Sequence, residues 1–236
     1  FTGAELVADK WNLSRKDLDN FALESHQKAA HATESKYFDR EILPVEGKNA
    51  EGMNDLVMAD EGIRFDASLD KLAGLNPVTE DGVITAGNAS QITDGAAAVV
   101  ICNDAGLKKI QANPRAEIVS ISVVGDDPVF MLTGPIPASI KALKTANLTI
   151  DDMDLYEVNE AFAPVPLAWA EDLKADKLKL NVNGGAMALG HPLGATGAKL
   201  MTTLLHEMER REATYGLQAI CEGGGTANAT IIKRSE

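Results

Sequence analysis

Two glycine-rich stretches near the C-terminus, each holding one reactive side chain, constrain this chain more than any other feature of its sequence. The first covers residues 183–197, NGGAMALGHPLGATG, and contains His191. The second covers residues 221–228, CEGGGTAN, and begins with Cys221. Because glycine has no Cβ, backbone, ligand and neighbouring side chains can approach closely at such places. Each stretch therefore predicts a tight turn that presents its reactive group to a site.

His191 lies between Gly190 and Pro192, and a helix is expected over residues 195–211. A lone histidine is more often structural than functional. Here the glycine and proline predict a tight strand-to-helix turn that presents the side chain at a helix N-terminus. Backbone amides at that end favour developing negative charge, so the setting favours a catalytic histidine.

Cys221 precedes the three glycines 223–225. A free cysteine is usually a small buried apolar residue. The glycine turn changes that expectation, because it places backbone amides, that of Gly223 among them, beside the sulfur. A thiol with a lowered pKa can act as a base as well as a nucleophile, and we expect Cys221 to do so. Cys102 ends an apolar run and is expected to be structural.

A third polar element, NEAFA at residues 159–163, follows an expected strand at residues 154–158. Asn159 could cap the next helix, since asparagine is a good N-cap, and a capping role does not exclude a catalytic one. Pro164 and Pro166 interrupt the first turns of that helix and predict a kink or a delayed start.

Composition excludes several classes of function. A net charge of −13 over 236 residues argues against a nucleic-acid-binding surface. No apolar run approaches the roughly 20 residues that span a bilayer. Two cysteines form no disulfide framework, which favours a reducing compartment such as the cytoplasm. The remaining histidines, His26, His31 and His206, have no ligand spacing, so no metal site is expected.

The periodicity of apolar residues predicts an α/β protein with a polar, helix-rich first part. Residues 37–45 read as extended and residues 46–81 as loops with short elements. The continuous apolar run at residues 95–102 predicts a strand, or a tightly packed element, buried on both faces. Helices are expected at residues 2–11, 14–36, 105–111, 138–146 and 195–211. Strands are expected at residues 117–124, 154–158, 178–182, 217–221 and 227–233, the last two joined as a hairpin at the three glycines.

Residues 159–163, 183–197 and 221–225 together resemble the thiolase family, enzymes that make or break the carbon–carbon bond of 3-ketoacyl-CoA. The resemblance runs almost end to end and implies an α/β layered sandwich (α-β-α-β-α). That fold has two similar halves and a loop domain inserted in the first half.

On the family pattern, residues 1–93 would form most of a helix-rich, CoA-binding loop domain. Residues 94–113 would end the N-terminal half, and residues 114–236 would form the C-terminal half. The chain begins with Phe1 and not with Met, so we expect a piece of a longer polypeptide. The family's nucleophilic cysteine would then precede Phe1.

The resemblance assigns roles to four residues of the reaction. His191 would activate the acyl-carrying cysteine, and Cys221 would remove a proton from the α-carbon of acetyl-CoA. Asn159, through a water, would join His191 in stabilising one thioester oxyanion, and the Gly223 amide would help with the other. The 221–228 segment looks like that of thiolases in fatty-acid or steroid breakdown.

The resemblance also implies a coenzyme A site, with CoA as substrate and no tightly bound cofactor. Ser90 belongs to a matching segment, TAGNASQITDGA, in which many members have glycine where this chain has Gln91. Arg64 would meet the nucleotide phosphates, and Met131 and Phe162 would line the thioester end. Thiolases assemble as homodimers or homotetramers, which we expect of the complete protein.

Two other interpretations remain open at this point. A ketoacyl-synthase-like condensing enzyme would share the fold, but such enzymes typically have a second histidine where this chain has Asn159. A non-catalytic thiolase-like partner subunit would not need both His191 and Cys221.

Overall fold

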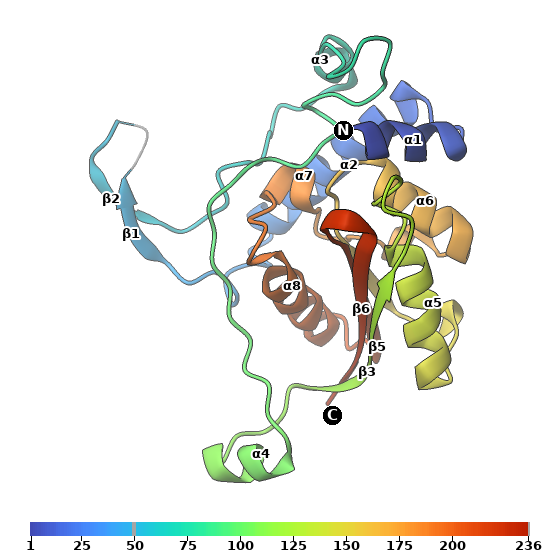
Figure 1. Cartoon of the computed structure of the whole chain (residues 1–236). Coiled ribbons are helices and arrows are strands. Elements are labelled where there is room, and N and C mark those ends of the chain that lie inside the picture. The colour runs from blue at the N-terminus through green and yellow to red at the C-terminus, as the bar shows by residue number, and fades with distance from the viewer. Residues whose placement is uncertain (49–50, 236) are drawn as a thin grey trace.

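The computed structural model describes residues 1–48 and 51–235, and Figure 1 shows their arrangement. A mixed four-stranded sheet carries helices on both faces, and the N-terminal helices pack at one end of it. A separate two-stranded hairpin projects from the body. The strands are β1 (Val45–Lys48), β2 (Asn54–Val57), β3 (Ala116–Gly125), β4 (Leu155–Val158), β5 (Tyr215–Cys221) and β6 (Thr226–Arg234). The α-helices are α1 (Thr2–Lys10), α2 (Arg15–Glu34), α3 (Leu69–Ala73), α4 (Asp104–Ile110), α5 (Pro135–Ala146), α6 (Pro164–Leu173), α7 (Ala186–Leu189) and α8 (Thr196–Arg210).

The strand order of the main sheet is β3-β6-β5-β4, with β4 and β5 parallel and the other neighbours antiparallel. Helices α5 and α6 cover one face and α8 covers the other (Figure 1). The expected β5–β6 hairpin is confirmed, and a 3₁₀ turn, Gly223–Gly225, joins its strands. Gly224 and Gly225 have φ of 75° and 85°, a region that favours glycine. The glycines therefore determine the turn that follows Cys221.

Trp169 fixes the α6 side of the sheet. Its side chain is fully buried, and its indole N–H donates to Ser139 Oγ on α5 at 2.9 Å. The ring also meets Tyr156 of β4 edge to face, with centroids 5.2 Å apart. A buried indole needs such a partner for its N–H, so this contact sets how α5, α6 and β4 pack together.

Helix α6 begins at Pro164, so the predicted delayed start is confirmed. Proline suits the first turn of a helix because its missing N–H would have no partner there. The prediction that Asn159 caps this helix is wrong. The N-cap is Ala163, and Asn159 lies upstream in the connection from β4.

The prediction of a strand at residues 178–182 is also wrong. A 3₁₀ turn, Lys177–Lys179, occupies its start, and only isolated bridges involve Leu180 and Val182. The side chain of Asn181 takes the place of a strand neighbour. Its Oδ1 accepts from the N–H of Val158 at 2.9 Å, and its Nδ2 donates to the carbonyl of Val158 at 2.8 Å. An amide side chain can thus satisfy the edge of β4 where the backbone does not.

Two further expectations fail. Residues 37–41 form turns, because Lys36 is left-handed with φ of 61° and the chain folds back on the end of α2. Residues 95–102 form no strand and are exposed, with Val100 at 86%. A strand buried on both faces needs a sheet neighbour at each edge, and none of the described strands lies beside this segment. Cys102 is likewise exposed.

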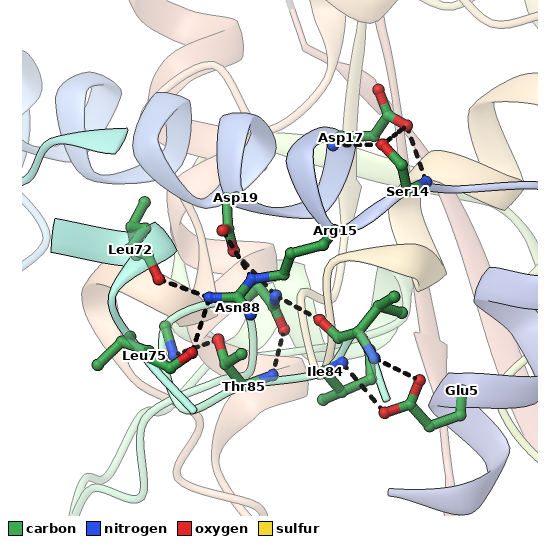
Figure 2. Close-up of polar contacts among 12 residues, drawn as sticks. Glu5, Ser14, Arg15, Asp17, Asp19, Leu72, Leu75, Ile84, Thr85 and Asn88 are labelled. Carbon is green, nitrogen blue, oxygen red and sulfur yellow. Dashed lines mark hydrogen bonds and ion pairs between the residues drawn. The ribbon is translucent and has the colours of Figure 1, made fainter. Parts of the chain in front are cut away.

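A polar network attaches the segment before Ser90 to the N-terminal helices (Figure 2). Buried Asp19 of α2 accepts from Arg15 Nε at 2.7 Å and from Asn88 Nδ2 at 3.0 Å. The Arg15 guanidinium also donates to the carbonyls of Leu72 and Leu75. The sequence SRKD at residues 14–17 predicts a capping box at the start of α2, and Ser14 and Asp17 form it. The loop that leads to Ser90 is therefore held by charge-assisted bonds to α2.

We predict that Asn181→Ala destabilises the chain, because it leaves the N–H and carbonyl of Val158 buried without partners. Each unsatisfied buried group costs about 1–3 kcal/mol. Asn12→Ala is the matched control, since Asn12 is exposed and also has positive φ, 51° against 43° for Asn181. Urea unfolding of both variants measures the difference. Equal loss of stability in the two would show that the Val158 contacts contribute nothing.

Candidate active site

His191 lies in the turn between α7 and α8, so the predicted strand-to-helix turn is corrected to a helix-to-helix turn. Its Nδ1 lies 2.6 Å from Thr196 Oγ1, and its Nε2 lies 3.3 Å from Asn159 Nδ2. The Thr196 hydroxyl donates its single hydrogen to the carbonyl of Pro192 at 3.1 Å. Thr196 therefore accepts from Nδ1–H of His191, which leaves the Nε2 lone pair to accept from Asn159.

Burial, followed by the charge of Lys199, lowers the pKa of His191. Both effects disfavour the protonated ring. The imidazole is therefore neutral near pH 7 and presents a basic nitrogen at Nε2. Sequence reasoning missed Thr196 and Lys199, although both follow His191 within the first turns of the helix that it precedes.

Asn159 follows the end of β4 and is almost fully buried, with 1% of its surface exposed. Its backbone N–H donates to the carbonyl of Ala219 at 3.0 Å, which extends the β4–β5 pairing by one residue. The side-chain Oδ1 is buried and has no hydrogen-bond partner among the described residues. A buried polar atom in that state indicates a place for a water or a ligand group.

Cys221 ends β5, and Asn159 follows the end of β4. Because β4 and β5 are parallel neighbours, both residues lie at the same edge of the sheet. Burial raises the pKa of the Cys221 thiol to about 12, with a smaller contribution from the charge of Glu222. The expectation of a lowered pKa is therefore wrong for the chain as described. Gly223 has open space around it, since a Cβ there would meet nothing within 4 Å.

Glu160, next to Asn159, is a buried carboxylate whose role the sequence left open. It accepts from Ser25 Oγ at 2.7 Å, from Asn181 Nδ2 at 3.0 Å and from the N–H of Met187 at 3.1 Å. Burial raises its pKa, and the three donors oppose that shift. A Cβ on Gly185 would collide with this carboxylate, so the glycine is required there. Glu160 thus joins α2, the end of β4 and α7, the helix that leads to His191.

Of the four residues expected to bind substrate, the structure brings two together and leaves two apart. Ser90 and Phe162 come together, because the N–H of Ser90 donates to the carbonyl of Ala161 at 3.0 Å and Ala89 bridges with Phe162. Met131 lies in the connection from β3 to α5, with φ of 57°. Arg64 is exposed, and its backbone N–H donates to His26 Nδ1 at 3.1 Å. No contact among the described residues joins the Arg64 or Met131 side chain to His191.

Two absences apply to residues 1–48 and 51–235. No group of three or more histidine, cysteine, aspartate or glutamate side chains is placed to hold a metal ion there. No helix in the same residues has both the length and the apolar character needed to cross a membrane.

Comparisons with known proteins identify the family of this chain. Residues 2–105 match the model of the thiolase N-terminal domain, and residues 112–234 match that of the thiolase C-terminal domain. The chain belongs to the thiolase family. Its four-stranded sheet with helices on both faces is thus part of a mixed α/β thiolase fold.

The relatives are enzymes by name. The chain is 53% identical over 234 residues to steroid 3-ketoacyl-CoA thiolase FadA6 of Mycobacterium tuberculosis. This match covers 99% of this chain and 56% of that protein. It is 45% identical to acetyl-CoA acetyltransferase of Paracoccus denitrificans, over 99% of this chain and 60% of that protein. The crystal structure of human mitochondrial 3-ketoacyl-CoA thiolase in complex with CoA matches with a TM-score of 0.92 and 43% identity. That match covers 99% of this chain and 58% of the human chain. The chain thus spans less than two thirds of the length of these thiolases.

Proposed function

We propose that this chain contributes the acid–base part of a thiolase active site, which transfers acyl groups between acyl-CoA and acetyl-CoA. The observation that carries the proposal is the contact between His191 Nε2 and Asn159 at the sheet edge where Cys221 ends β5. A neutral imidazole whose Nε2 carries no proton is the form that accepts a proton from a thiol. The thiolase relatives and the match to both domains support the same reading.

The first stage begins at a second cysteine, which we place in the part of a complete thiolase that this chain does not span. His191 Nε2 takes the proton of that thiol, and the thiolate attacks the thioester carbonyl of acyl-CoA. CoA leaves as its thiol and takes the proton back from His191. Asn159 binds a water through its unpartnered Oδ1, and this water together with His191 stabilises a thioester oxyanion.

Cys221 acts in the second stage. In the condensing direction its thiolate removes a proton from the α-carbon of acetyl-CoA. The carbanion attacks the acyl-enzyme carbonyl, and the new carbon–carbon bond forms as the bond from the acyl group to the second cysteine breaks. That cysteine leaves as a thiolate, to which the proton held by Cys221 returns. In the cleaving direction the released carbanion takes the proton from the Cys221 thiol. The raised pKa of Cys221 keeps that thiol protonated near neutral pH, which is the form that gives a proton in the cleaving direction. The open backbone at Gly223 supports a second oxyanion site.

We further propose the division of the chain that the family pattern implies. Residues 1–93 form most of a CoA-binding loop domain, residues 94–113 end the N-terminal half and residues 114–236 form the C-terminal half. We propose a 3-ketoacyl-CoA of fatty-acid or steroid breakdown as the substrate. Two of the relatives named above support it, because one is named a steroid 3-ketoacyl-CoA thiolase and the other a 3-ketoacyl-CoA thiolase. The complete enzyme is a cytoplasmic homodimer or homotetramer that needs no tightly bound cofactor. Light scattering of the complete enzyme measures its oligomeric state. A monomer at micromolar concentration would exclude the proposed homodimer or homotetramer.

We predict that Cys221→Ser in the complete enzyme abolishes condensation but spares acylation. A serine hydroxyl is a far poorer acid or base than a thiol, and losing one acid–base group typically costs about 10²–10⁴-fold in rate. Incubation with labelled acyl-CoA followed by mass spectrometry should still detect the acyl-enzyme. Cys102→Ser is the matched control and should leave both steps unchanged, because Cys102 is exposed and belongs to none of the elements that position His191, Asn159 and Cys221. Loss of labelling in a folded Cys221→Ser enzyme would assign the acyl-carrying role to Cys221.

We predict that Arg64→Ala raises KM for CoA substrates while kcat changes little. Arg64 is exposed and is proposed to meet the nucleotide phosphates, at a distance from the reacting carbon. Ser90, Met131 and Phe162 are proposed to lie nearer the thioester. Arg40→Ala removes another exposed arginine, one paired with Glu209 at 3.4 Å, and serves as the control. Steady-state kinetics of the complete enzyme measures KM for both variants. If both keep the wild-type KM, Arg64 is not part of the CoA site.

A further inference from the structure

The short helix α7 ends immediately before His191, and its last carbonyls need partners. Helix ends leave C=O groups without intrahelical donors, and a glycine cap commonly provides N–H donors for only some of them. Here the C-cap is Gly190, whose N–H returns to the carbonyl of Ala186 at 3.0 Å. The carbonyls of Met187, Ala188 and Leu189 remain to be satisfied in other ways.

The side chain of Gln91, from another segment, lies near two of these three carbonyls. Gln91 Nε2 donates to the carbonyl of Met187 at 2.6 Å, with that of Ala188 at 3.5 Å. Lys199 Nζ of α8 donates to the carbonyl of Leu189. Together these two side chains cover the C-terminal end of α7.

The backbone of Gln91 holds the same element at two further points. Its N–H donates to the carbonyl of Ala186 at 3.4 Å, and its carbonyl accepts from the N–H of His191 at 3.1 Å. Gln91 therefore contacts α7 at its start, at its end and at the catalytic turn itself.

The second hydrogen of the same amide reaches a different loop. Gln91 Nε2 also donates to the carbonyl of Gly62 at 2.8 Å, two residues before Arg64. Lys199 parallels this contact, since its Nζ lies 3.5 Å from Asp60 Oδ1. A Cβ on Gly62 would lie 2.7 Å from the carbonyl of Ala188, so the loop and α7 are in close contact. The loop that carries Arg64 and the helix that leads to His191 thus share one cap.

We propose that Gln91 is a positioning residue of the thiolase site. Its carboxamide caps α7 and, through Gly62, holds the Arg64 loop in register with the His191 turn. This proposal rests on the thiolase function for its catalytic consequence, but the cap itself does not depend on that function. Lys199 shares the role at the neighbouring carbonyl.

The test replaces the donor and keeps the size of the side chain. In Gln91→Leu of this chain, hydrogen exchange at the amides of Leu189, Gly190 and His191 should become about tenfold faster, as expected for the loss of two hydrogen bonds. Exchange in β5 and β6 should stay unchanged. The pKa of His191, followed by NMR, should rise toward the value of a solvated imidazole, because a loosened turn admits water. Gln27→Leu, the same change at an exposed position of α2, is the control.

In the complete enzyme, Gln91→Leu should lower kcat, because a misplaced His191 slows the reaction. It should raise KM less than Arg64→Ala does, because the Arg64 loop loses its tie at Gly62 but keeps the guanidinium. If Gln91→Leu also destabilises the sheet, Gln91→Asn replaces it under the same criteria, since the shorter amide cannot reach both carbonyls. Unchanged exchange at the three amides and an unchanged His191 pKa would overturn the proposal. A wild-type enzyme without thiolase activity would instead contradict the proposed function, while the exchange measurement would still decide on the cap.

Discussion

The buried carboxylate of Glu160 is the interaction on which the site depends. A carboxylate removed from water is costly unless donors compensate for the lost hydration. Here a hydroxyl from α2, an amide from Asn181 and the N–H of Met187 at the start of α7 all converge on it. Ser25 is 135 residues from Glu160 in sequence, whereas Asn181 and Met187 are 21 and 27 residues from it. Satisfying one charge therefore determines how α2, β4 and α7 meet. Gly185 is fixed by the same contact, since no Cβ fits beside the carboxylate.

The position of His191 follows from that arrangement in two steps. Glu160 fixes the start of α7, and Gln91 with Lys199 satisfies its end. The turn beyond α7 then places the imidazole between Thr196 and Asn159, which select one tautomer. The position of His191, the proposed catalytic base, is thus set by backbone carbonyls and amides that surrounding side chains satisfy, rather than by packing of the histidine ring alone.

Elements with strong local signals could be predicted from the sequence, and elements that depend on distant partners could not. The capping box of α2, the proline start of α6 and the glycine hairpin after Cys221 each rest on local chemistry, and the structure confirms them. Residues 95–102 have the composition of a buried strand but lie beside no described strand. At residues 178–182 the Asn181 side chain makes the hydrogen bonds to Val158 that a neighbouring strand would make. The periodicity of apolar residues carries no signal for such a contact. The contact between His191 and Asn159 joins two motifs that the sequence did identify, whereas the pKa of Cys221 depends on burial that composition could not give.

The most direct test of this account is the ¹⁵N NMR spectrum of the His191 ring near pH 7, in the wild-type chain and in Glu160→Gln. The wild type should have a neutral imidazole, with the proton on Nδ1 and none on Nε2. In Glu160→Gln one acceptor oxygen becomes a donor amide, so α7 should lose its anchor and His191 should show averaged tautomers. A wild-type ring protonated on Nε2, or a Glu160→Gln spectrum identical to that of the wild type, would contradict the account.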